Sequence, residues 1–190
     1  MTRTLPIYPA ILALVKAGDS ILDLGSCFAQ DLRILAADGA PTTHMFASDI
    51  VPEFWELSYK LYQDQEKMKA RFFQADIFEP NSESLQQMKG KIDVVLANYF
   101  LHLWNWDKQI EAARNMVALT KPGAWFVGCH TGSTLGREFS FDSGTAGEFT
   151  MFFHNAKTTG KFWKEVGDEL DLGFEVESVH LALAKYFKKL

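Results

Sequence analysis

The sequence predicts an α/β fold, with a doubly wound and mostly parallel sheet that carries helices on both faces. Short apolar runs alternate with segments of helical periodicity, and the spacing between the runs suits helical crossovers that return to the same sheet. The length of 190 residues, taken at about 150 residues per domain, favours one domain over residues 1–190. A content of 47% hydrophobic and 23% charged residues is typical of globular proteins and excludes a disordered chain.

Five apolar runs are predicted as strands, and each of the first four leads into a polar turn and a helix. Residues 38–41, with the sequence DGAP, end the first of these helices. Pro52 opens the second helix at a position where proline is favoured, and residues 121–123, KPG, stop the fourth. The predicted strands are 20–25, 44–48, 71–75, 92–97 and 124–129, and the predicted helices are 28–37, one from Pro52, 82–88, 106–119 and 154–170.

The regular alternation stops after the fifth predicted strand. Residues 130–151 are rich in glycine and have little periodicity, so we expect a loop excursion there, and such loops often line binding sites. Residues 174–187 are apolar and favour strand structure without a clear turn. The presence of a final antiparallel strand therefore stays open.

Charge and composition exclude several classes of protein. The chain has 19 basic and 24 acidic side chains and a net charge of −5, which gives no general attraction for nucleic acid. Cys27 and Cys129 are too few for a disulfide framework, and no secretory leader is recognised, so we expect a cytoplasmic protein. No apolar stretch approaches the roughly 18 residues of a membrane span.

The first predicted strand runs into a turn of small residues, with the sequence DLGSCFA at 23–29. In an open parallel sheet, ligands bind beyond the carboxyl ends of the strands, where the strand order reverses. A dinucleotide site requires a G-x-G-x-x-G turn that lets a pyrophosphate approach the helix. Here Cys27 stands at the second glycine position and Ala29 at the last position of a D-x-G-x-x-x-G pattern, which favours a nucleoside ligand without a pyrophosphate.

Aspartates end the next two predicted strands. Asp49 can accept hydrogen bonds from both hydroxyls of a ribose. Asp76 can accept one from the exocyclic amine of an adenine, with Ile77 and Phe78 covering the ring. The alternative is that both aspartates only cap helices. Acidic residues at the ends of three successive strands, Asp23 being the first, make a more specific pattern than any one of them.

With these residues, the chain resembles class I S-adenosylmethionine-dependent methyltransferases over nearly its whole length. Residues 22–33, 38–41, 100–104 and 153–155 look more narrowly like fungal methyltransferases that tailor meroterpenoid and polyketide products. The resemblance implies a Rossmann-like fold, S-adenosyl-L-methionine as cofactor, and methyl transfer to a carboxylate or hydroxyl of a hydrophobic product of secondary metabolism. It departs from the family at Ala29, where glycine is usual, and in having a shorter helical region before the first strand.

The residues expected to bind the cofactor lie in the turns that follow the strands. Asp31 is set apart, because its place inside the first helix favours a solvated or capping role at least as much. The cofactor-binding candidates are Asp23, Gly25, Ser26, Asp49, Ile50, Asp76, Ile77, Asn98 and Tyr99.

Histidines and tryptophans supply the candidates for the acceptor side. His102 has the residue type of a general base that deprotonates an acceptor hydroxyl, and the alternative is a histidine packed at a helix start. A carboxylate acceptor would need no base, since it is already ionised at neutral pH. The histidine spacing matches no metal motif, so we predict no metal. The substrate-pocket candidates are His102, Trp104, His130 and His154.

The leading hypothesis is an S-adenosylmethionine-dependent O-methyltransferase that acts on a small apolar acceptor. The alternative is a protein with the same fold that no longer transfers methyl groups, either a cyclase or isomerase or a non-catalytic binding protein. A nicotinamide oxidoreductase comes third, because Cys27 disfavours a dinucleotide. A homodimer in which a second subunit completes the lid of the site is left open.

Overall fold

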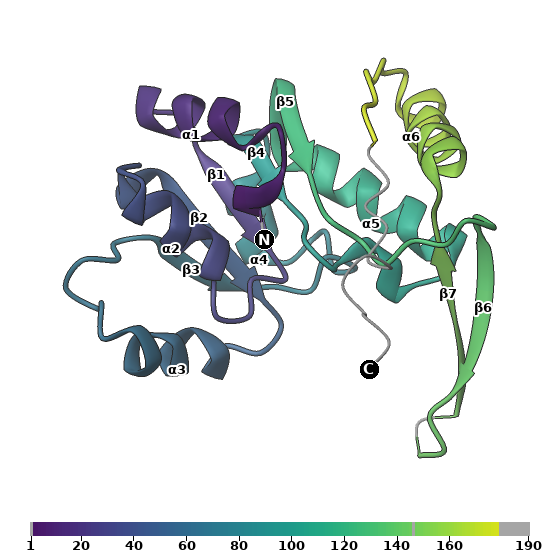
Figure 1. Ribbon diagram of the computed structural model, residues 1–190, viewed down its shortest axis with the longest axis horizontal. Coiled ribbons are helices and arrows are strands. Elements are labelled where there is room, and N and C mark those ends of the chain that lie inside the picture. The colour runs from purple at the N-terminus through teal and green to yellow at the C-terminus, as the bar shows by residue number, and fades with distance from the viewer. Residues whose placement is uncertain (1, 146, 179–190) are drawn as a thin grey trace, which may run out of the picture. The chain divides into compact units, whose positions relative to one another are not determined.

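The computed structural model describes residues 2–145 and 147–178, and the chain divides into two compact units (Figure 1). The first unit comprises Met1–Leu101 and Glu111–His130, and the second comprises His102–Ile110 and the chain from Thr131 onward. Helix α5 (Trp106–Ala118) contributes its first residues to the second unit and the rest to the first.

The first unit is built on a five-stranded sheet in the order β3-β2-β1-β4-β5, and all of its pairings are parallel. The strand order reverses between β1 and β4, which is the arrangement of a doubly wound sheet and confirms the predicted fold class. The strands are β1 (Ile21–Leu24), β2 (Met45–Asp49), β3 (Arg71–Gln74), β4 (Ile92–Leu96) and β5 (Thr120–Val127).

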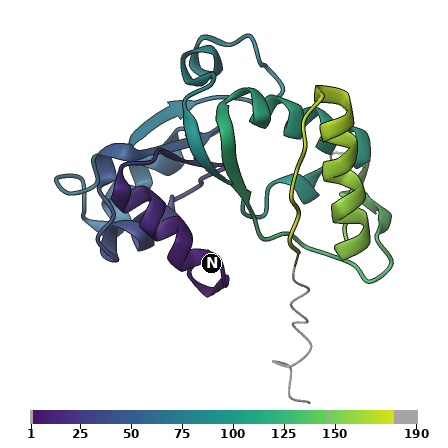
Figure 2. The same ribbon diagram turned by 90° about the horizontal axis from the view of Figure 1, so that it is seen from above.

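Helices cover this sheet on both sides, with α1 on one face and α4 on the other (Figure 2). Side chains of α1 and α2, such as Ile11 and Leu35, pack with Ile21, Met45 and Leu96 of the strands in one buried cluster. Strands that are buried on both faces explain the continuous apolar runs in the sequence. Besides α5, the helical segments of this unit are η1 (Thr2–Thr4), α1 (Tyr8–Ala17), α2 (Gln30–Ala37), η2 (Thr42–His44), α3 (Glu53–Tyr62) and α4 (Glu83–Met88).

Most boundaries of the predicted elements lie within two residues of the prediction, and the largest difference is at the start of β5. Strand β5 begins at Thr120, so residues 121–123 lie inside the strand although they were expected to be only a turn. Its register against β4 is irregular between Ile92 and Val94, which accommodates Gly123 at a φ of 78°. Helix α6 (Ala156–Leu170) starts two residues later than expected, because Asn155 caps it and accepts a hydrogen bond from the Thr158 amide.

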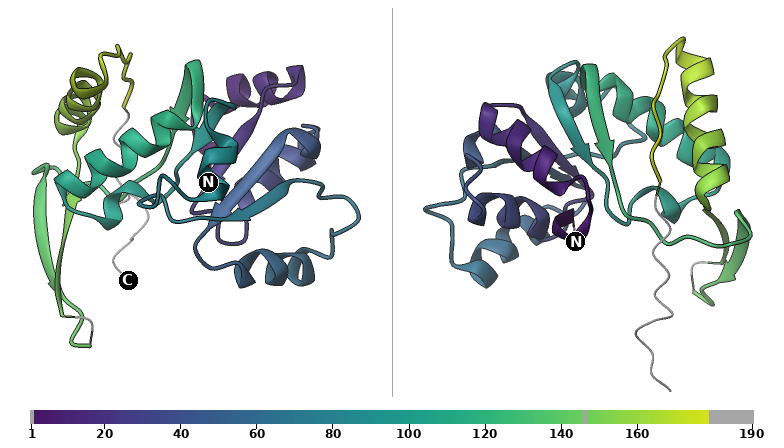
Figure 3. Two further views of the ribbon diagram at one scale, coloured as in Figure 1. Left: turned by 180° about the vertical axis from the view of Figure 1, so that it is seen from behind. Right: turned by 45° about the horizontal axis from the view of Figure 1, so that its top comes forward.

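The second unit contains a β-hairpin where a loop excursion over residues 130–151 was expected. Strands β6 (Arg137–Asp142) and β7 (Glu148–Phe153) pair in antiparallel register, and the left view of Figure 3 draws the two green strands side by side. The loop expectation is therefore wrong: the glycines lie before the hairpin and in its turn, and the two strands themselves contain none. Within each strand every second residue faces the same side, which gathers Phe139, Phe141, Phe149, Met151 and Phe153 on one face.

A buried side-chain amide holds the rest of the second unit together. The short helix η3 (Leu101–Leu103) begins in the first unit, and its residues from His102 onward belong to the second. Gln109 is fully buried, and its Nε2 donates to the carbonyls of Trp104, at 2.8 Å, and Phe152, at 2.9 Å. The ring of Phe162 from α6 lies 5.8 Å from that of Trp106. Backbone and aromatic side chains therefore converge on one small core.

Residues 174–178 form no helix or strand, and the rest of the predicted apolar segment 174–187 lies outside the described residues. Among the helices that are described, none combines the length and the apolar composition needed to cross a bilayer.

Candidate functional site

The turn after β1 lies at the carboxyl edge of the sheet and folds over the end of β2. The amides of Gly25 and Ser26 both donate to the Ser48 carbonyl, at 2.9 and 3.0 Å. Gly25 has a φ of +68°, and a Cβ at this position would lie 2.6 Å from the Phe100 ring. Only glycine satisfies both conditions, so the Phe100 ring packs directly against the backbone of the turn.

The two residues that replace glycines of the familiar pattern adopt glycine-like conformations. Cys27 has a φ of 47° and Ala29 a φ of 49°, both in the left-handed region. Ala29 is fully buried and belongs to the hydrophobic cluster of this unit. The turn therefore keeps its shape at the cost of backbone strain at two non-glycine residues.

Asp49 is oriented by this turn. Its Oδ2 accepts a hydrogen bond from the Cys27 amide at 2.8 Å, and its Oδ1 accepts one from the Val51 amide at 3.0 Å. Each carboxylate oxygen retains capacity for a further donor. The geometry thus presents an oriented acceptor pair at the end of β2, as a diol-binding carboxylate requires.

The end of the neighbouring strand β3 carries the other predicted contacts. Asp76 is exposed, and its Oδ1 accepts a hydrogen bond from the Phe78 amide at 2.9 Å. Ile77 is buried and its carbonyl accepts from Asn115, whereas Ile50 has 61% of its side chain exposed. Because β2 and β3 are adjacent, the exposed Asp76 carboxylate after β3 and the exposed Ile50 side chain after β2 lie at the ends of neighbouring strands.

Three carboxylates influence one another around the turn. Burial, followed by the charges of Asp31 and Asp49, raises the pKa of Asp23 well above its ordinary value. Ser26, whose Oγ is buried and has no hydrogen-bond partner, lies in the same turn. A group that brings positive charge and hydrogen-bond donors would relieve both features.

Asn98 and Tyr99 follow β4. The Asn98 side chain donates to Asp31 and to Thr2, each at 2.8 Å, and accepts from the Cys129 amide at 2.9 Å. Tyr99 has a φ of 53° and leaves 45% of its side chain exposed. The amide of Asn98 is thus engaged with the protein, whereas the ring of Tyr99 is accessible.

Asp31 differs from the expectation of a solvated or capping residue. It is 9% exposed, and the Thr2 amide donates to its Oδ1 at 2.8 Å. Burial raises the pKa of Asp31, but the hydrogen bonds outweigh burial and hold it below its ordinary value. Sequence reasoning missed this role because Asn98 is 67 residues away, and no local pattern distinguishes a buried aspartate from a solvated one in a helix.

The residues expected on the acceptor side are divided between the two units. His130 belongs to the first unit, where its ring folds back on its own chain, so that a Cβ on Gly128 would lie 2.8 Å from its Nε2. His102, Trp104 and His154 belong to the second unit. Burial lowers the pKa of His102, which keeps its ring neutral at pH 7.

His154 is part of the core of the second unit. Its Nε2 lies 2.9 Å from Gln109 Oε1 and its Nδ1 lies 3.2 Å from Thr158 Oγ1. The rings of Phe152 and Phe162 pack around it at 4.8 and 5.2 Å. Burial lowers the pKa of His154 to about 4. Residues 2–145 and 147–178 contain no group of three or more histidine, cysteine or carboxylate side chains arranged for a metal ion.

Comparison with known proteins identifies the family. A family of methyltransferase domains matches residues 21–123, which include β1 to β4 and most of the candidate site. The chain belongs to this methyltransferase family. The resemblance inferred from the sequence is therefore confirmed.

Fungal proteins are among its relatives. The chain is 36% identical over 190 residues to the O-methyltransferase phiE of Fungal sp. (strain ATCC 74256), an alignment that covers 98% of this chain and 62% of phiE. It is 32% identical over 177 residues to the Asnovolin E/Chermesin D methyltransferase nvfJ of Aspergillus novofumigatus, covering 92% of this chain and 62% of nvfJ. The chain thus spans less than two thirds of the length of these relatives.

Solved structures share the fold. One is the 1,6-didemethyltoxoflavin-N1-methyltransferase of Burkholderia thailandensis with bound S-adenosylhomocysteine, with a TM-score of 0.57, 19% identity, and coverage of 84% of this chain and 66% of that one. Another is the cyclase SpnF, with a TM-score of 0.60, 16% identity, and coverage of 83% and 56%. The same fold therefore occurs in a methyltransferase and in a cyclase.

Proposed function

We propose that the first unit binds S-adenosyl-L-methionine and that the protein transfers its methyl group to an oxygen of a small, largely apolar acceptor in fungal secondary metabolism. The observation that carries the proposal is the Asp49 carboxylate, held by the Cys27 and Val51 amides at the end of β2 beside the Gly25 turn. Membership of the methyltransferase family supports the reaction class.

The residues at the carboxyl edge of the sheet fit this cofactor. Asp49 offers two oriented oxygens to the ribose hydroxyls, and Asp76 and Ile50 offer an acceptor and an apolar surface to the base. The buried Oγ of Ser26 lacks a partner within the protein. The raised pKa of Asp23 suits a ligand that carries positive charge, because such a ligand stabilises the ionised carboxylate.

When bound, S-adenosyl-L-methionine supplies an electrophilic methyl group to an attacking oxygen. The protein contributes orientation, which accounts for much of the rate of such transfers. A hydroxyl acceptor needs a base, and His102 has the residue type for that role, with a ring that burial keeps neutral at pH 7. A carboxylate acceptor dispenses with the base.

An oxygen acceptor is supported by the relatives. One of them is named an O-methyltransferase and another a methyltransferase of Asnovolin E and Chermesin D. On this basis we propose for this chain an acceptor that is a small natural product and that is methylated on oxygen. The second candidate is a cyclase of the same fold, which the similarity to SpnF favours.

Calorimetric titration with S-adenosylhomocysteine tests the cofactor site, with NADH as the negative control. We expect saturable binding of the nucleoside and none of NADH. Asp49→Ala removes two charge-assisted hydrogen bonds to the ribose, so affinity should fall by about 10- to 100-fold. Asp49→Asn keeps the size of the side chain and one acceptor oxygen, so its affinity for S-adenosylhomocysteine should lie between that of the wild type and that of Asp49→Ala.

Glu66→Ala is the matched control, because it also removes one carboxylate but does so at a side chain that is 96% exposed and outside the site. Unchanged affinity in Asp49→Ala would contradict the proposed site. Binding without any methyl transfer to a panel of apolar acids and alcohols, together with turnover that consumes no cofactor, would favour the cyclase.

A further inference from the structure

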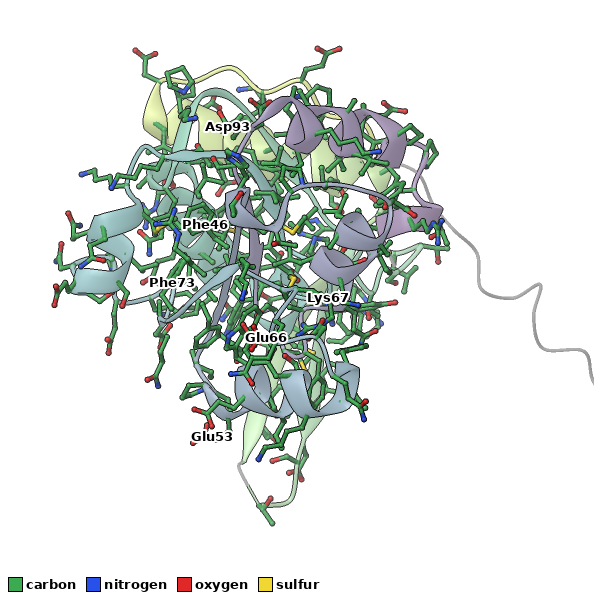
Figure 4. All side chains as sticks on the ribbon, turned by 90° about the vertical axis from the view of Figure 1, so that its left-hand side faces the viewer. Phe46, Glu53, Glu66, Lys67, Phe73 and Asp93 are labelled. Carbon is green, nitrogen blue, oxygen red and sulfur yellow. The ribbon has the colours of Figure 1, made fainter. Side chains whose placement is uncertain are left out.

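Strands β1 and β4 are joined by polar side chains at both of their ends. At the amino end, Asp93 Oδ2 accepts hydrogen bonds from the Ser20 amide at 2.8 Å, from the Ser20 hydroxyl at 2.7 Å and from Lys121 at 2.7 Å. At the carboxyl end, Asp31 Oδ2 accepts from Asn98 Nδ2 at 2.8 Å. Figure 4 labels Asp93 at one end of the sheet and Glu53, which opens α3 beyond β2, toward the other.

The carboxyl-end connection lies where the strand order reverses. Asp31 belongs to α2, which follows β1, and Asn98 follows β4, so their hydrogen bond links the two strands that border the reversal point. A crevice opens at this point in doubly wound sheets because the two crossovers leave toward opposite faces. The Asp31–Asn98 bond therefore fixes the separation of the two sides of the crevice.

Asn98 is engaged on every side by the protein. Both hydrogens of its Nδ2 are donated, one to Asp31 and one to Thr2 Oγ1, and its Oδ1 accepts the Cys129 amide. The next residue, Tyr99, donates its own amide to the Cys129 carbonyl at 2.7 Å and is held in the left-handed region. Asn98 thus ties together the ends of β4 and β5 and the first turn of α2.

We propose that Asp31 and Asn98 form a positioning pair, which holds the Gly25 turn and the Tyr99 backbone at the separation that the cofactor requires without contacting the cofactor themselves. The pair was not expected from the sequence, which placed Asn98 in direct contact with the ligand. This inference rests on the proposed binding of S-adenosyl-L-methionine to the same edge of the sheet.

The Asp31–Asn98 hydrogen bond is costly to lose. Asp31 is buried and its carboxylate accepts donors from both Thr2 and Asn98, so each is a charge-assisted hydrogen bond in a region with little water. Removing one donor leaves a buried charge less well solvated, and the local structure must shift to compensate. Such a shift would change the separation of the two sides of the crevice while the sheet remains folded.

Exchanging the two side chains distinguishes positioning from direct contact. Asn98→Asp places two carboxylates against each other, and Asp31→Asn replaces the charged acceptor by a neutral one. In the combined variant Asp31→Asn/Asn98→Asp, the amide introduced at position 31 donates to the carboxylate introduced at position 98, which also accepts the Cys129 amide. The bond is restored with its roles reversed.

The measurements are affinity for S-adenosylhomocysteine by calorimetry and Tm for each protein, with titrations well below the lowest Tm. We expect Asn98→Asp to weaken binding by about tenfold or more and Asp31→Asn by less, since the single oxygen of the introduced amide still accepts one of the two hydrogen bonds, in neutral form. The combined variant should recover most of the affinity. Single variants that bind like the wild type would overturn the proposal.

A combined variant no tighter than Asn98→Asp would also overturn the proposal, because it would mean that one of the two side chains contacts the ligand directly. Asp93→Asn is the matched control, since it weakens the corresponding connection at the amino end, and it should lower Tm while leaving affinity unchanged. An equal loss of affinity in this control would assign the effect to general stability and reject positioning. Absence of binding by the wild type would overturn the proposed function itself, whereas wild-type binding with unaffected single variants would overturn this inference alone.

Discussion

The two units of this chain use polar residues in different ways. In the first unit, the buried surface is mainly aliphatic and the carboxylates Asp23, Asp31 and Asp49 gather at one edge of the sheet. In the second unit, the core is aromatic, and the buried Gln109 bonds to the half-buried His154 and to the backbone. The first arrangement leaves acceptor capacity for a ligand, and the second uses its polar groups to hold the fold.

This comparison shows why residue type alone is a poor guide to a site. His154 is a substrate-pocket candidate in the sequence, yet its two ring nitrogens face Gln109 and Thr158 inside a cluster of aromatic rings. Asp31 looks like an ordinary helical surface residue, yet it is buried at the edge where a ligand is expected. In both cases the role depends on which distant groups the side chain meets, and residue type does not reveal these partners.

The largest effect is expected from the aromatic core of the second unit. Phe162 is 2% exposed and lies 5.2 Å from the His154 ring and 5.3 Å from the Trp163 ring. Phe162→Ala should destabilise this unit by about 3–5 kcal/mol. Near-ultraviolet circular dichroism during thermal unfolding measures the loss, and affinity for S-adenosylhomocysteine should persist below the transition. Leu135→Ala, at a 62% exposed position of the same unit, is the control. Parallel loss of affinity in Phe162→Ala would show that the two units are not separable in function.

A smaller effect is expected from pH, again in the second unit. The folded-state pKa of His154 is lowered to about 4, below the ordinary value of 6.5, so the unfolded chain binds a proton between these values and the folded chain does not. Stability should therefore fall as pH drops from about 6.5 to 4, by on the order of 2 kcal/mol.

Thermal unfolding followed across this pH range measures the dependence. His154→Gln should flatten it, whereas His44→Gln, at an exposed histidine, should leave it as in the wild type. An unchanged slope in His154→Gln would assign the pH dependence to other groups.

The smallest effect concerns the strained turn of the first unit. Cys27→Gly relieves a left-handed conformation that costs a non-glycine residue about 1–2 kcal/mol, and the greater flexibility of unfolded glycine offsets about 0.5–1 kcal/mol of this gain. We expect a net stabilisation of about 0.5–1 kcal/mol, measured by denaturant unfolding.

Ala29→Gly is its matched partner. The same relief applies at Ala29, but the variant also removes a fully buried methyl group worth about 0.8 kcal/mol, so its stability should change little. A larger gain in Ala29→Gly than in Cys27→Gly would reverse this reasoning.

Sequence periodicity predicted the parallel sheet, because strands buried on both faces must be continuous apolar runs and the crossovers between them must be helices. It also placed Gly25 and Asp49 at the carboxyl edge, since the ends of parallel strands share one edge. The hairpin of β6 and β7 was missed because each strand is only six residues long and the glycines that precede the hairpin and form its turn made the whole segment resemble a loop.

By itself the sequence determined the family, the alternation of strands and helices from β1 to β5, and the turn that follows β1. These depend on residues that are close along the chain, where side-chain type and spacing fix local conformation. Only the tertiary structure decided that Asp31 meets Asn98, that Gln109 meets His154, and that Cys27 donates its amide to Asp49. Such partners are separated by 22 to 67 residues, and they come together only because the sheet order and the packing of the helices bring distant turns to the same place.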